Sequence, residues 1–189
     1  MLTSRWWTRE RFNRLGVLVG CCGFAFAMLA WLCPARLVLQ GRPEHSVPFT
    51  VGIRLNSPAV WERGQFVQFH VRDLRPYYPA GTPFTKGVAG LPGDHLQLEG
   101  RTFRINGSVI GTARSTDSQG RPAWLYVPER TPGGFCSIES TRSVAGGSAD
   151  CILPPETLFV LGVHGRSFDS KYWGIVRFTE VAGRVVPLL

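Results

Sequence analysis

Lysine is almost absent from this chain: Lys86 and Lys171 are the only two among 21 basic residues. Arginine stays protonated in proteins, whereas a lysine amine shielded from water can lose its proton and act as a general base. An arginine-rich composition would by itself leave few lysines, so scarcity alone does not identify a site. The context of Lys86 is more informative, because it begins an apolar run that ends in a Pro92-Gly93-Asp94 turn. This order predicts a strand that enters a tight turn and buries the amine.

The chain also lacks any run of lysine or arginine, and it has no zinc-finger or helix-turn-helix spacing. Its net charge of +8 is concentrated near the start, where residues 1–42 hold six arginines and one acid. Residues 43–189 keep 15 of the 21 bases and 12 of the 13 acids, so they are far less basic. These observations argue against nucleic-acid binding. The four histidines, at positions 45, 70, 95 and 164, show no metal-ligand spacing, and we expect neither a metal nor another cofactor.

Charge is missing from residues 15–33, a run of 19 mostly apolar residues. As a helix this run would extend about 28 Å, close to the ~30 Å hydrocarbon core of a bilayer. Arginines precede it, which favours a cytoplasmic N-terminus. A cleaved signal peptide is the alternative, although the run is long for one and no clear small-x-small site follows. We therefore predict a basic cytoplasmic tail over 1–14, a retained transmembrane helix over 15–33 and an exported domain over 34–189.

Five cysteines fall into two groups. Cys21, Cys22 and Cys33 lie in the predicted span, where they serve as apolar residues. Cys136 and Cys151 lie in the exported part, 15 positions apart. In an oxidising compartment they can form a disulfide that closes a loop rich in glycine and serine. Neither has a convincing base nearby, which argues against a cysteine nucleophile.

No long helical period follows the predicted span. Short runs of alternating or β-branched residues occur instead, separated by Gly, Pro, Asn or Asp. We expect strands over 49–55, 65–72, 95–98, 102–105, 109–110, 124–127, 158–163, 172–178 and 183–186. Asn106-Gly107 between two such runs predicts a hairpin. The pattern indicates a mostly β domain, with a link over 34–44 and a cap or insertion over 112–150, where Ser, Gly, Arg and Pro are frequent.

A second polar cluster follows the apolar run 158–163. Ser167, Asp169, Ser170 and Lys171 occupy four of five consecutive positions. Hydroxyls and a carboxylate in one turn can orient a nearby amine, which a lysine base needs. An ordinary Asp/Ser turn is the alternative interpretation.

The stretches KGVAGLPGD (86–94) and SFDSKYWG (167–174), in this order, resemble the sequence boxes of the type I signal peptidase family, peptidase family S26. These are serine proteases with a Ser/Lys dyad. The resemblance implies a signal-peptidase-like antiparallel β-sheet catalytic domain with one N-terminal transmembrane helix. It implies Lys86 as the general base, with Ser167 and Asp169 orienting its amine and no cofactor. It also implies a bacterial inner-membrane location, with a periplasmic catalytic domain that acts on an exported protein precursor.

Two serines are candidates for the nucleophile. Ser46 lies in Ser46-Val47-Pro48, and Ser57 lies in Asn56-Ser57-Pro58. In the conjugative-transfer branch that the chain most resembles, the TraF-type pilin-processing peptidases, the nucleophile sits in Ser-x-Pro ahead of an apolar strand. Ser46 fits that order and is favoured, with Ser57 as the alternative. His45 is a poor partner for Ser46, because adjacent side chains on an extended segment point to opposite faces.

The chain also departs from the family boxes. Gly87 stands where the family usually has arginine, and Glu44 where some relatives carry a hydroxyl for the oxyanion. Val163-His164-Gly165 replaces a Gly-Asp-Asn pattern, and Lys171 replaces a common arginine. The predicted function is a membrane-anchored serine endopeptidase that cleaves, or cyclises, an exported precursor such as a conjugative pilin, alongside type IV secretion components. The alternatives are a general leader peptidase and, given these departures, a non-catalytic periplasmic scaffold.

Overall fold

The computed structural model describes residues 14, 16–25, 28, 35–39, 47–138 and 141–188. The chain divides into two compact units, Met1–Arg36 and Leu37–Leu189. In the first unit, residues 14, 16–25 and 28 are helical. Among the described residues, no helix has the length and apolar character needed to cross a bilayer. The prediction of a transmembrane helix over 15–33 is therefore not borne out there, and residues 15, 26–27 and 29–33 of that run lie outside the described part.

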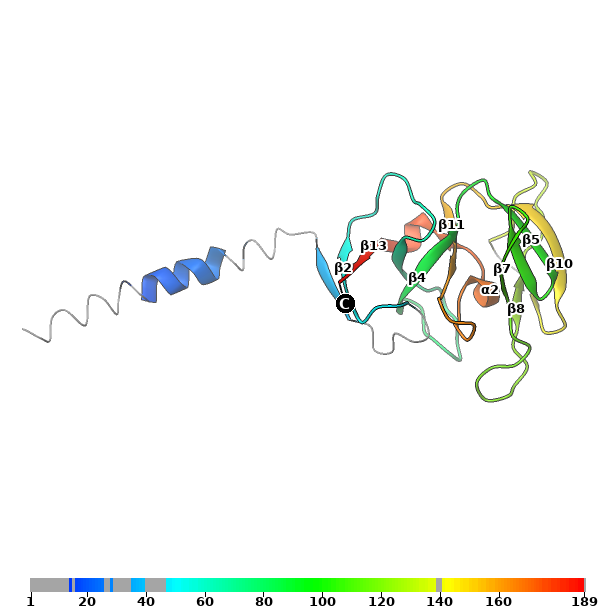
Figure 1. Ribbon diagram of the computed structural model, residues 1–189, viewed down its shortest axis with the longest axis horizontal. Helices are drawn as coiled ribbons and strands as arrows, with labels where there is room; N and C mark the ends of the chain where they lie inside the picture. Colours follow the sequence, from blue (N-terminus) through cyan, green and yellow to red (C-terminus); the bar gives the residue numbers. More distant parts are fainter. Residues whose placement is uncertain are drawn as a thin grey trace, which may run out of the picture. The chain divides into compact units, whose positions relative to one another are not determined.

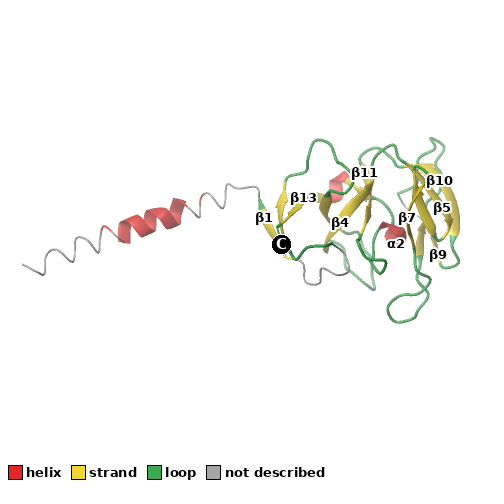
Figure 2. Ribbon diagram, in the orientation of Figure 1, coloured by secondary structure: helices red, strands yellow, loops and turns green. Residues whose placement is uncertain are grey.

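The second unit is mostly β, as predicted (Figures 1 and 2). The largest sheet has the strand order β1-β2-β13-β3-β4-β11-β12, a second has β10-β5-β6-β7, and β8 pairs with β9. The pairings from β2 onward are antiparallel. The strands are β1 (Arg36–Leu39), β2 (Val51–Leu55), β3 (Phe66–His70), β4 (Pro83–Gly90), β5 (His95–Gly100), β6 (Thr102–Ile105), β7 (Ser108–Thr112), β8 (Leu125–Val127), β9 (Thr141–Ser143), β10 (Gly147–Ile152), β11 (Thr157–Leu161), β12 (Val176–Arg177) and β13 (Val181–Pro187).

The largest sheet is buried on both faces where β11 crosses it. Side chains along a strand alternate between faces. Phe159 belongs to an apolar cluster with residues of β5, β6 and β8, whereas Leu158 and Val160 belong to a cluster with residues of β3 and β4. A third cluster joins Val38, Val47, Phe49 and Val185, with Phe66 packed against it. β11, which precedes the polar cluster 167–171, is thus fixed between two apolar clusters.

The turn after β4 is held by side-chain hydrogen bonds. Asp94 accepts hydrogen bonds from the backbone N–H of Leu91 at 2.7 Å and from Asn106 Nδ2 at 2.8 Å, and it forms an ion pair with Arg63. Gly93 has a φ of +85°, a conformation that favours glycine in a turn. The predicted strand and tight turn around Lys86 are therefore present.

The hairpin predicted at Asn106-Gly107 is also confirmed. It joins β6 to β7, and the φ angles of Asn106 and Gly107 are +50° and +80°. Two positive φ angles in a two-residue connection are typical of the turn that matches strand twist.

Residues 112–150 contribute β8, β9 and most of β10. β10 pairs with β5 along its whole length, from Gly147 opposite Gly100 to Ile152 opposite His95. Cys136 and Cys151 form a disulfide with their Cα atoms 5.0 Å apart, buried in the cluster that contains Phe159. The disulfide fastens the loop after β8 to β10.

Two predictions about local structure are wrong. The strand expected over 172–178 is present only as β12, at Val176–Arg177; the short helix α2 (Ser170–Trp173) precedes it and the 3-10 helix η2 (Phe178–Glu180) follows. Asp169 caps the start of α2 by accepting the Lys171 N–H, and Gly174, with a φ of +98°, ends it. The link expected over 34–44 contains β1, which extends the largest sheet beyond β2.

Candidate active site

Lys86 is buried in the middle of the largest sheet. It lies on β4 opposite Val67 of β3, and its neighbour Gly87 lies opposite Leu161 of β11. Its side chain points to the same face of β4 as Phe84 and Val88, because alternate residues on a strand share a face. Only 3% of the residue is exposed. The β-sheet therefore places a lysine amine among apolar side chains, as its position in the sequence predicts.

The amine of Lys86 has a hydroxyl partner. Lys86 Nζ donates a hydrogen bond to Ser167 Oγ at 2.8 Å, and Ser167 is 1% exposed on the connection between β11 and α2. Burial lowers the pKa of Lys86 from 10.5 to about 8, because the charged form loses its hydration; the Asp169 carboxylate opposes this shift and the Lys171 charge adds to it. A substantial fraction of this amine is thus neutral just above neutral pH, as a general base requires.

Asp169 is fully buried and accepts several hydrogen bonds. Its carboxylate accepts the backbone N–H groups of Gly162 at 3.1 Å and of Lys171 at 3.2 Å. Both of its oxygens also accept hydrogen bonds from Lys171 Nζ, each at 2.8 Å. The carboxylate therefore ties the end of β11 to the start of α2. Because Ser167 lies two residues before it, Asp169 fixes the path of the segment that reaches Lys86.

Lys171 stood out in the sequence as one of two lysines, as a member of the polar cluster and as a replacement for a common arginine, but no role was assigned to it. In the structure it is 4% exposed and forms a buried ion pair with Asp169. Its charge helps to lower the pKa of Lys86, so this segment supplies a positive charge although Gly87 carries none. The signal available in the sequence was that the only two lysines both fall in the two matching boxes. Ser170 is structural: its Oγ accepts the N–H of Val160 on β11 at 2.9 Å.

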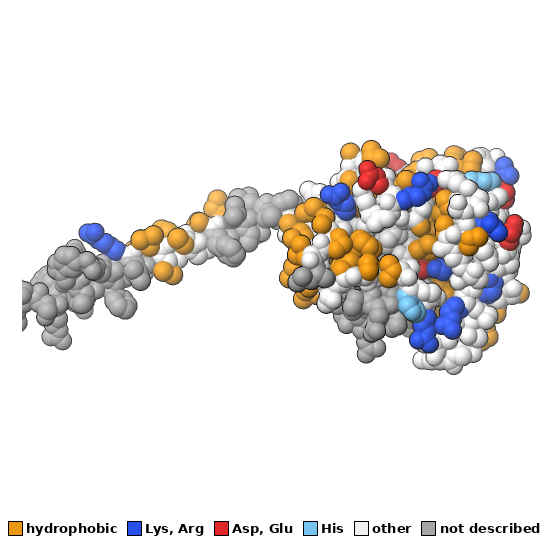
Figure 3. All heavy atoms as spheres, in the orientation of Figure 1, with side chains coloured by type: hydrophobic (Ala, Val, Ile, Leu, Met, Phe, Trp, Pro, Cys, Tyr) orange, Lys and Arg blue, Asp and Glu red, His pale blue; other side chains and the backbone are white. Residues whose placement is uncertain are grey.

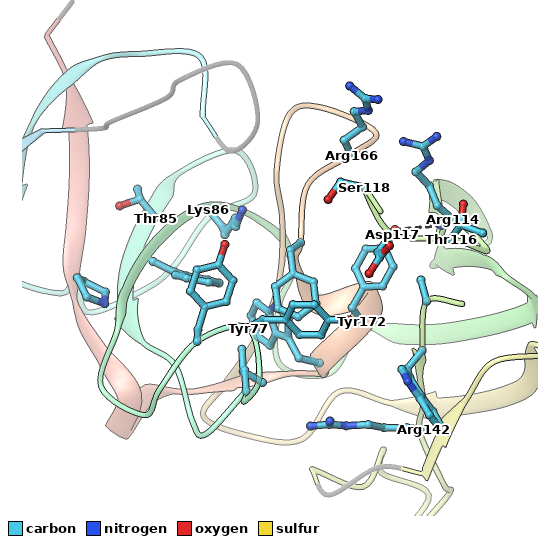
Figure 4. Close-up of a pocket in the computed structure, with 18 residues that line it drawn as sticks. Tyr77, Thr85, Lys86, Arg114, Thr116, Asp117, Ser118, Arg142, Arg166 and Tyr172 are labelled. Atoms are coloured by element: carbon cyan, nitrogen blue, oxygen red, sulfur yellow. Dashed lines mark hydrogen bonds between the residues drawn. The ribbon is translucent and has the colours of Figure 1, made fainter. Parts of the chain in front are cut away.

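Lys86 lines a pocket of about 650 Å³. Figure 4 shows Lys86 at one side of this pocket, Tyr77 and Tyr172 across its middle, and Arg114 and Arg166 at an edge away from Lys86. The pocket walls come from β4 and the segment before it, the segment after β7, β9, and α2 with the connection that leads to it from β11. A polypeptide segment has room to lie beside the lysine. Within the described ranges, no three His, Cys, Asp or Glu side chains cluster as metal ligands would.

The two candidate nucleophiles differ in what the structure says of them. Ser57 is exposed in the loop after β2, and it is not among the residues that line the pocket. Ser46 lies outside the described residues, together with Glu44 and His45. The residue that follows it, Val47, is completely buried in the cluster that contains Phe49 and contacts Phe66.

Comparison with known proteins gives a consistent family. Residues of this chain are 28% identical over 127 positions to "Signal peptidase I" of Leptolyngbya laminosa, covering 66% of this chain and 50% of that protein. They are 26% identical over 135 positions to "Probable signal peptidase I-2" of Synechocystis sp., covering 71% and 49%. They are 26% identical over 124 positions to "Signal peptidase I" of Bacillus caldolyticus, covering 65% and 58%. The chain thus spans about half the length of the curated relatives it matches.

A crystal structure of a signal peptidase I from Enterococcus faecalis matches with a TM-score of 0.36 and 23% identity, covering 67% of this chain and 97% of that one. The family model described as signal peptidase, peptidase S26, matches residues 12–189. That match includes β4 with its buried lysine and the segment from Ser167 to Lys171. On the strength of a match over nearly its whole length, the chain belongs to the peptidase S26 signal peptidase family.

Proposed function

We propose that this protein is a serine endopeptidase in which Ser46 is the nucleophile and Lys86 the general base. The observation that carries the proposal is the environment of Lys86. Its amine is buried, hydrogen-bonded to Ser167 and held at a pKa of about 8 beside a pocket large enough for a peptide. A buried lysine with a packing role alone would not need a pocket beside its amine. Family membership supports the same chemistry.

The first half of the reaction forms an acyl-enzyme. Neutral Lys86 Nζ takes the proton from Ser46 Oγ while that oxygen bonds to the carbonyl carbon of the substrate. Backbone N–H groups around Ser46 stabilise the oxyanion. The C–N bond then breaks, and the departing amine takes the proton back from the Lys86 ammonium. Ser167 and, through the shape of its segment, Asp169 keep the Lys86 amine directed at the reacting atoms.

The second half transfers the acyl group. Water gives a proton to Lys86 and attacks the ester carbon, and the C–O bond to Ser46 breaks as the oxygen regains its proton. Hydrolysis leaves two linear chains. If the N-terminal amine of the same polypeptide attacks instead of water, the product is a cyclic chain, lighter than the linear one by one water molecule. Both outcomes need the same lysine.

The assignment of Ser46 is supported by the contacts of the residues that follow it. Phe49 packs edge-on against Phe66, with ring centroids 5.0 Å apart, and Phe66 lies opposite Gly87 on β4. Val47 belongs to the same cluster as Phe49. The chain just after Ser46 is therefore anchored against β3, the neighbour of the strand that carries Lys86. Ser57 is exposed in the loop after β2 and does not line the pocket beside Lys86.

Two substrate classes follow from different observations. The relatives named signal peptidase I support removal of leader peptides from exported precursors. The Ser46-Val47-Pro48 sequence supports the specialised processing or cyclisation of a pilin, with components of a type IV secretion apparatus as partners. We place leader removal first, because several relatives support it, and pilin processing second.

We further propose that residues 15–33 anchor the protein in the bacterial inner membrane, with residues 1–14 in the cytoplasm and the β domain in the periplasm. The uncharged run and the arginines before it support this topology. The Cys136–Cys151 disulfide suits an oxidising compartment. Leu37, Leu39, Val186 and Leu188 are exposed on or beside β1 and β13, and Figure 3 shows hydrophobic side chains gathered over this end of the second unit.

The test uses the full-length chain with two purified substrates, a leader-bearing exported protein and a pilin precursor. Wild type, Ser46→Ala, Ser57→Ala and Lys86→Ala are compared, and the products are weighed by intact mass. We expect Ser46→Ala and Lys86→Ala to lose activity on whichever precursor the wild type processes, and Ser57→Ala to retain it. The relative rates on the two precursors separate leader removal from pilin processing, and the product mass separates hydrolysis from cyclisation.

Other outcomes would replace the proposal. Loss of activity in Ser57→Ala but not in Ser46→Ala would move the nucleophile to Ser57. If the wild type processed neither precursor and all variants still bound a secretion component, the protein would be a scaffold. The scaffold is tested because Gly87 and Glu44 differ from the residues usual in the family boxes.

A further inference from the structure

The pocket beside Lys86 has a strongly cationic far wall that the peptidase chemistry does not use. Its lining includes the side chains of Arg114, Arg142 and Arg166, which come from the segment after β7, from β9 and from the connection between β11 and α2. All three residues are exposed. Within the described part of the chain, none of the three guanidinium groups forms an ion pair with a carboxylate.

The single acid of the lining is already neutralised. Asp117 forms an ion pair with Arg121 Nε at 2.8 Å, and it also accepts the backbone N–H groups of Gln119 at 2.8 Å and Arg121 at 2.9 Å. Burial acts to raise the pKa of Asp117, but the hydrogen bonds from Arg121 and Gln119 and the Arg121 charge outweigh it, so the pKa is lowered. Asp117 therefore has its charge balanced by a residue outside the lining, and the pocket keeps a surplus of positive charge.

Arg114 is held in place by contacts to the active-site segment. Its backbone N–H donates to the hydroxyl of Tyr172 on α2 at 3.0 Å, and its carbonyl accepts a hydrogen bond from the Arg101 guanidinium. Arg101 also donates to the carbonyls of Ala113 and Ala123, each at 3.0 Å. The backbone that carries Arg114 is thus fixed on both sides, so little backbone ordering would be needed when an anion binds.

Arg166 is joined to the catalytic machinery by the chain itself, since it immediately precedes Ser167, the hydrogen-bond partner of Lys86. Figure 4 shows the guanidinium groups of Arg114 and Arg166 at the same edge of the pocket, near Ser118, with Arg142 at another edge. Two arginines from different segments at one edge of a pocket can bind a carboxylate, because each presents a planar fork of donors.

Aromatic rings line the space between Lys86 and these arginines. The ring of Phe168 stacks on that of Tyr172 with centroids 5.7 Å apart, and it lies 5.6 Å from Tyr77 and 5.9 Å from Tyr78. All four residues belong to the lining. A row of rings gives an extended chain an apolar surface to lie on between the reacting carbonyl and the cationic edge.

We propose that this pocket is a specificity site for an acidic side chain of the polypeptide substrate, a few residues from the bond that is cut. Arg114 and Arg166 bind the carboxylate, Arg142 adds positive potential from the other edge, and the aromatic row supports the intervening chain. This inference rests on the proposed peptidase function, because it takes the pocket beside Lys86 to hold the substrate. Charge complementarity identifies the ligand group as a carboxylate.

A phospholipid headgroup is the other anion that these arginines could meet. The geometry favours a peptide, since the arginines line a pocket that continues to Lys86 and carries aromatic walls along the way. A headgroup at a flat bilayer surface would contact the arginines without entering the part of the pocket that leads to Lys86.

The test uses the full-length chain in detergent and a set of fluorescent peptides that share a cleavable core of small residues. Each peptide carries a single Glu, Gln or Lys at one position, and the position is scanned along both sides of the core. The variants are Arg114→Gln, Arg166→Gln, the double variant and Arg166→Glu. Arg130→Gln is the matched control, because Arg130 is exposed and does not line the pocket.

We expect kcat/KM of the wild type to favour Glu over Gln by about tenfold at one position, the effect of a charge-assisted hydrogen bond. The preference should disappear in the double variant, fall in each single variant and move toward Lys in Arg166→Glu. Arg130→Gln should keep it. Raising the salt concentration should weaken the preference of the wild type, because the arginines are exposed to solvent.

Failure of this inference is distinct from failure of the proposed function. A wild type that cleaves the peptides with no Glu preference, or with one that both Gln variants keep, overturns the inference and leaves the peptidase intact. If the wild type cleaves none of them, the same peptides are tested for binding by fluorescence anisotropy, where an Arg114- and Arg166-dependent preference for Glu supports the site and its absence overturns it. Arg114- and Arg166-dependent binding to phosphatidylglycerol vesicles, with no peptide preference, assigns the arginines to lipid and overturns it too.

Discussion

The two lysines of this chain lie in comparable positions and have different partners. Lys86 on β4 and Lys171 on α2 are both nearly inaccessible to water, with 3% and 4% of each residue exposed. Lys171 contacts both carboxylate oxygens of Asp169 at 2.8 Å, whereas the hydrogen bond from Lys86 goes to the hydroxyl of Ser167. Burial lowers the pKa of Lys86 to about 8, because the charged form of its amine loses hydration.

The residues of the turn 167–171 give the two lysines different roles, Lys86 as a base and Lys171 as an ion-pair partner. The Asp169 carboxylate acts to raise the pKa of Lys86. The same carboxylate forms an ion pair with Lys171, and the charge of Lys171 acts to lower the pKa of Lys86. The charge of Lys171 thus partly offsets the stabilisation that the Asp169 carboxylate gives to the charged form of Lys86. The ion pair between Lys171 and Asp169 holds the turn together, and the lowered pKa of Lys86 suits that lysine to proton transfer.

The largest effect should come from replacing Lys86 with methionine. We expect cleavage to fall by about a thousandfold or more, because no other described group can take the proton of the nucleophile at that position. We also expect the free energy of unfolding near pH 7 to rise, since a pKa lowered from 10.5 to about 8 corresponds to a burial cost of about 3 kcal/mol. Rates and denaturant unfolding are measured on the same preparation. Full activity of Lys86→Met would refute the assigned role.

Lys171→Met should have the opposite effect on stability. The change leaves the fully buried Asp169 without its ion-pair partner, and we expect the free energy of unfolding to fall by about 3 to 5 kcal/mol. The double variant Asp169→Asn/Lys171→Met should recover part of this loss, because it removes the uncompensated charge. Equal stabilities for Lys86→Met and Lys171→Met in denaturant unfolding would mean that the two lysines are not distinguished as described.

The pH dependence of kcat/KM should reveal the coupling between the two lysines. The rate needs neutral Lys86, so it should rise with pH through a pKa of about 8. Asp169→Asn should move this rise to lower pH, because the carboxylate raises the pKa of Lys86. Lys171→Met should move it to higher pH, because the Lys171 charge lowers that pKa. A rise that stays in place in both variants would show that Asp169 and Lys171 do not act on the base.

The same pKa predicts a difference in stability with pH between wild type and Lys86→Met. Between pH of about 8 and 10.5 the unfolded wild-type chain binds more protons at this lysine than the folded chain does. The free energy of unfolding of the wild type should therefore rise, relative to that of Lys86→Met, as pH increases through this window. Urea unfolding at several pH values measures the difference, and parallel curves for the two proteins would contradict it.

The smallest effect should come from Gly87→Ala. A Cβ at Gly87 would lie 3.5 Å from the Leu161 carbonyl oxygen and 3.8 Å from Phe66, both ordinary contacts. We expect activity close to that of the wild type and a change in the free energy of unfolding within about 1 kcal/mol. Gly90→Ala on the same strand is the contrast, since its Cβ would lie 2.7 Å from Ile105 and Leu153 and should cost about 1 to 3 kcal/mol. Thermal unfolding of both variants, with a cleavage assay, checks the pair.

Much of the fold could be predicted because its signals are local. The Asn106-Gly107 hairpin and the turn at Pro92-Gly93-Asp94 depend on the φ angles and side-chain hydrogen bonds of a few adjacent residues. The alternation of apolar residues predicted most strands of the largest sheet. The helix α2 was predicted as a strand, because its start depends on Asp169 capping the Lys171 N–H rather than on any hydrophobic period.

The sequence by itself determined that a rare lysine enters a turn and that a polar cluster follows a later apolar strand, since both depend on neighbouring residues. Only the tertiary structure decided that Ser167 hydrogen-bonds to Lys86, 81 positions away in the sequence, and that Lys171 forms an ion pair with Asp169. It also decided that Arg114 and Arg166 lie at one edge of the same pocket. These relations depend on the pairing of β4 with β11 and on the path of the chain into α2. Burial and partner choice set the pKa of an amine, and both belong to the folded chain rather than to any short stretch of it.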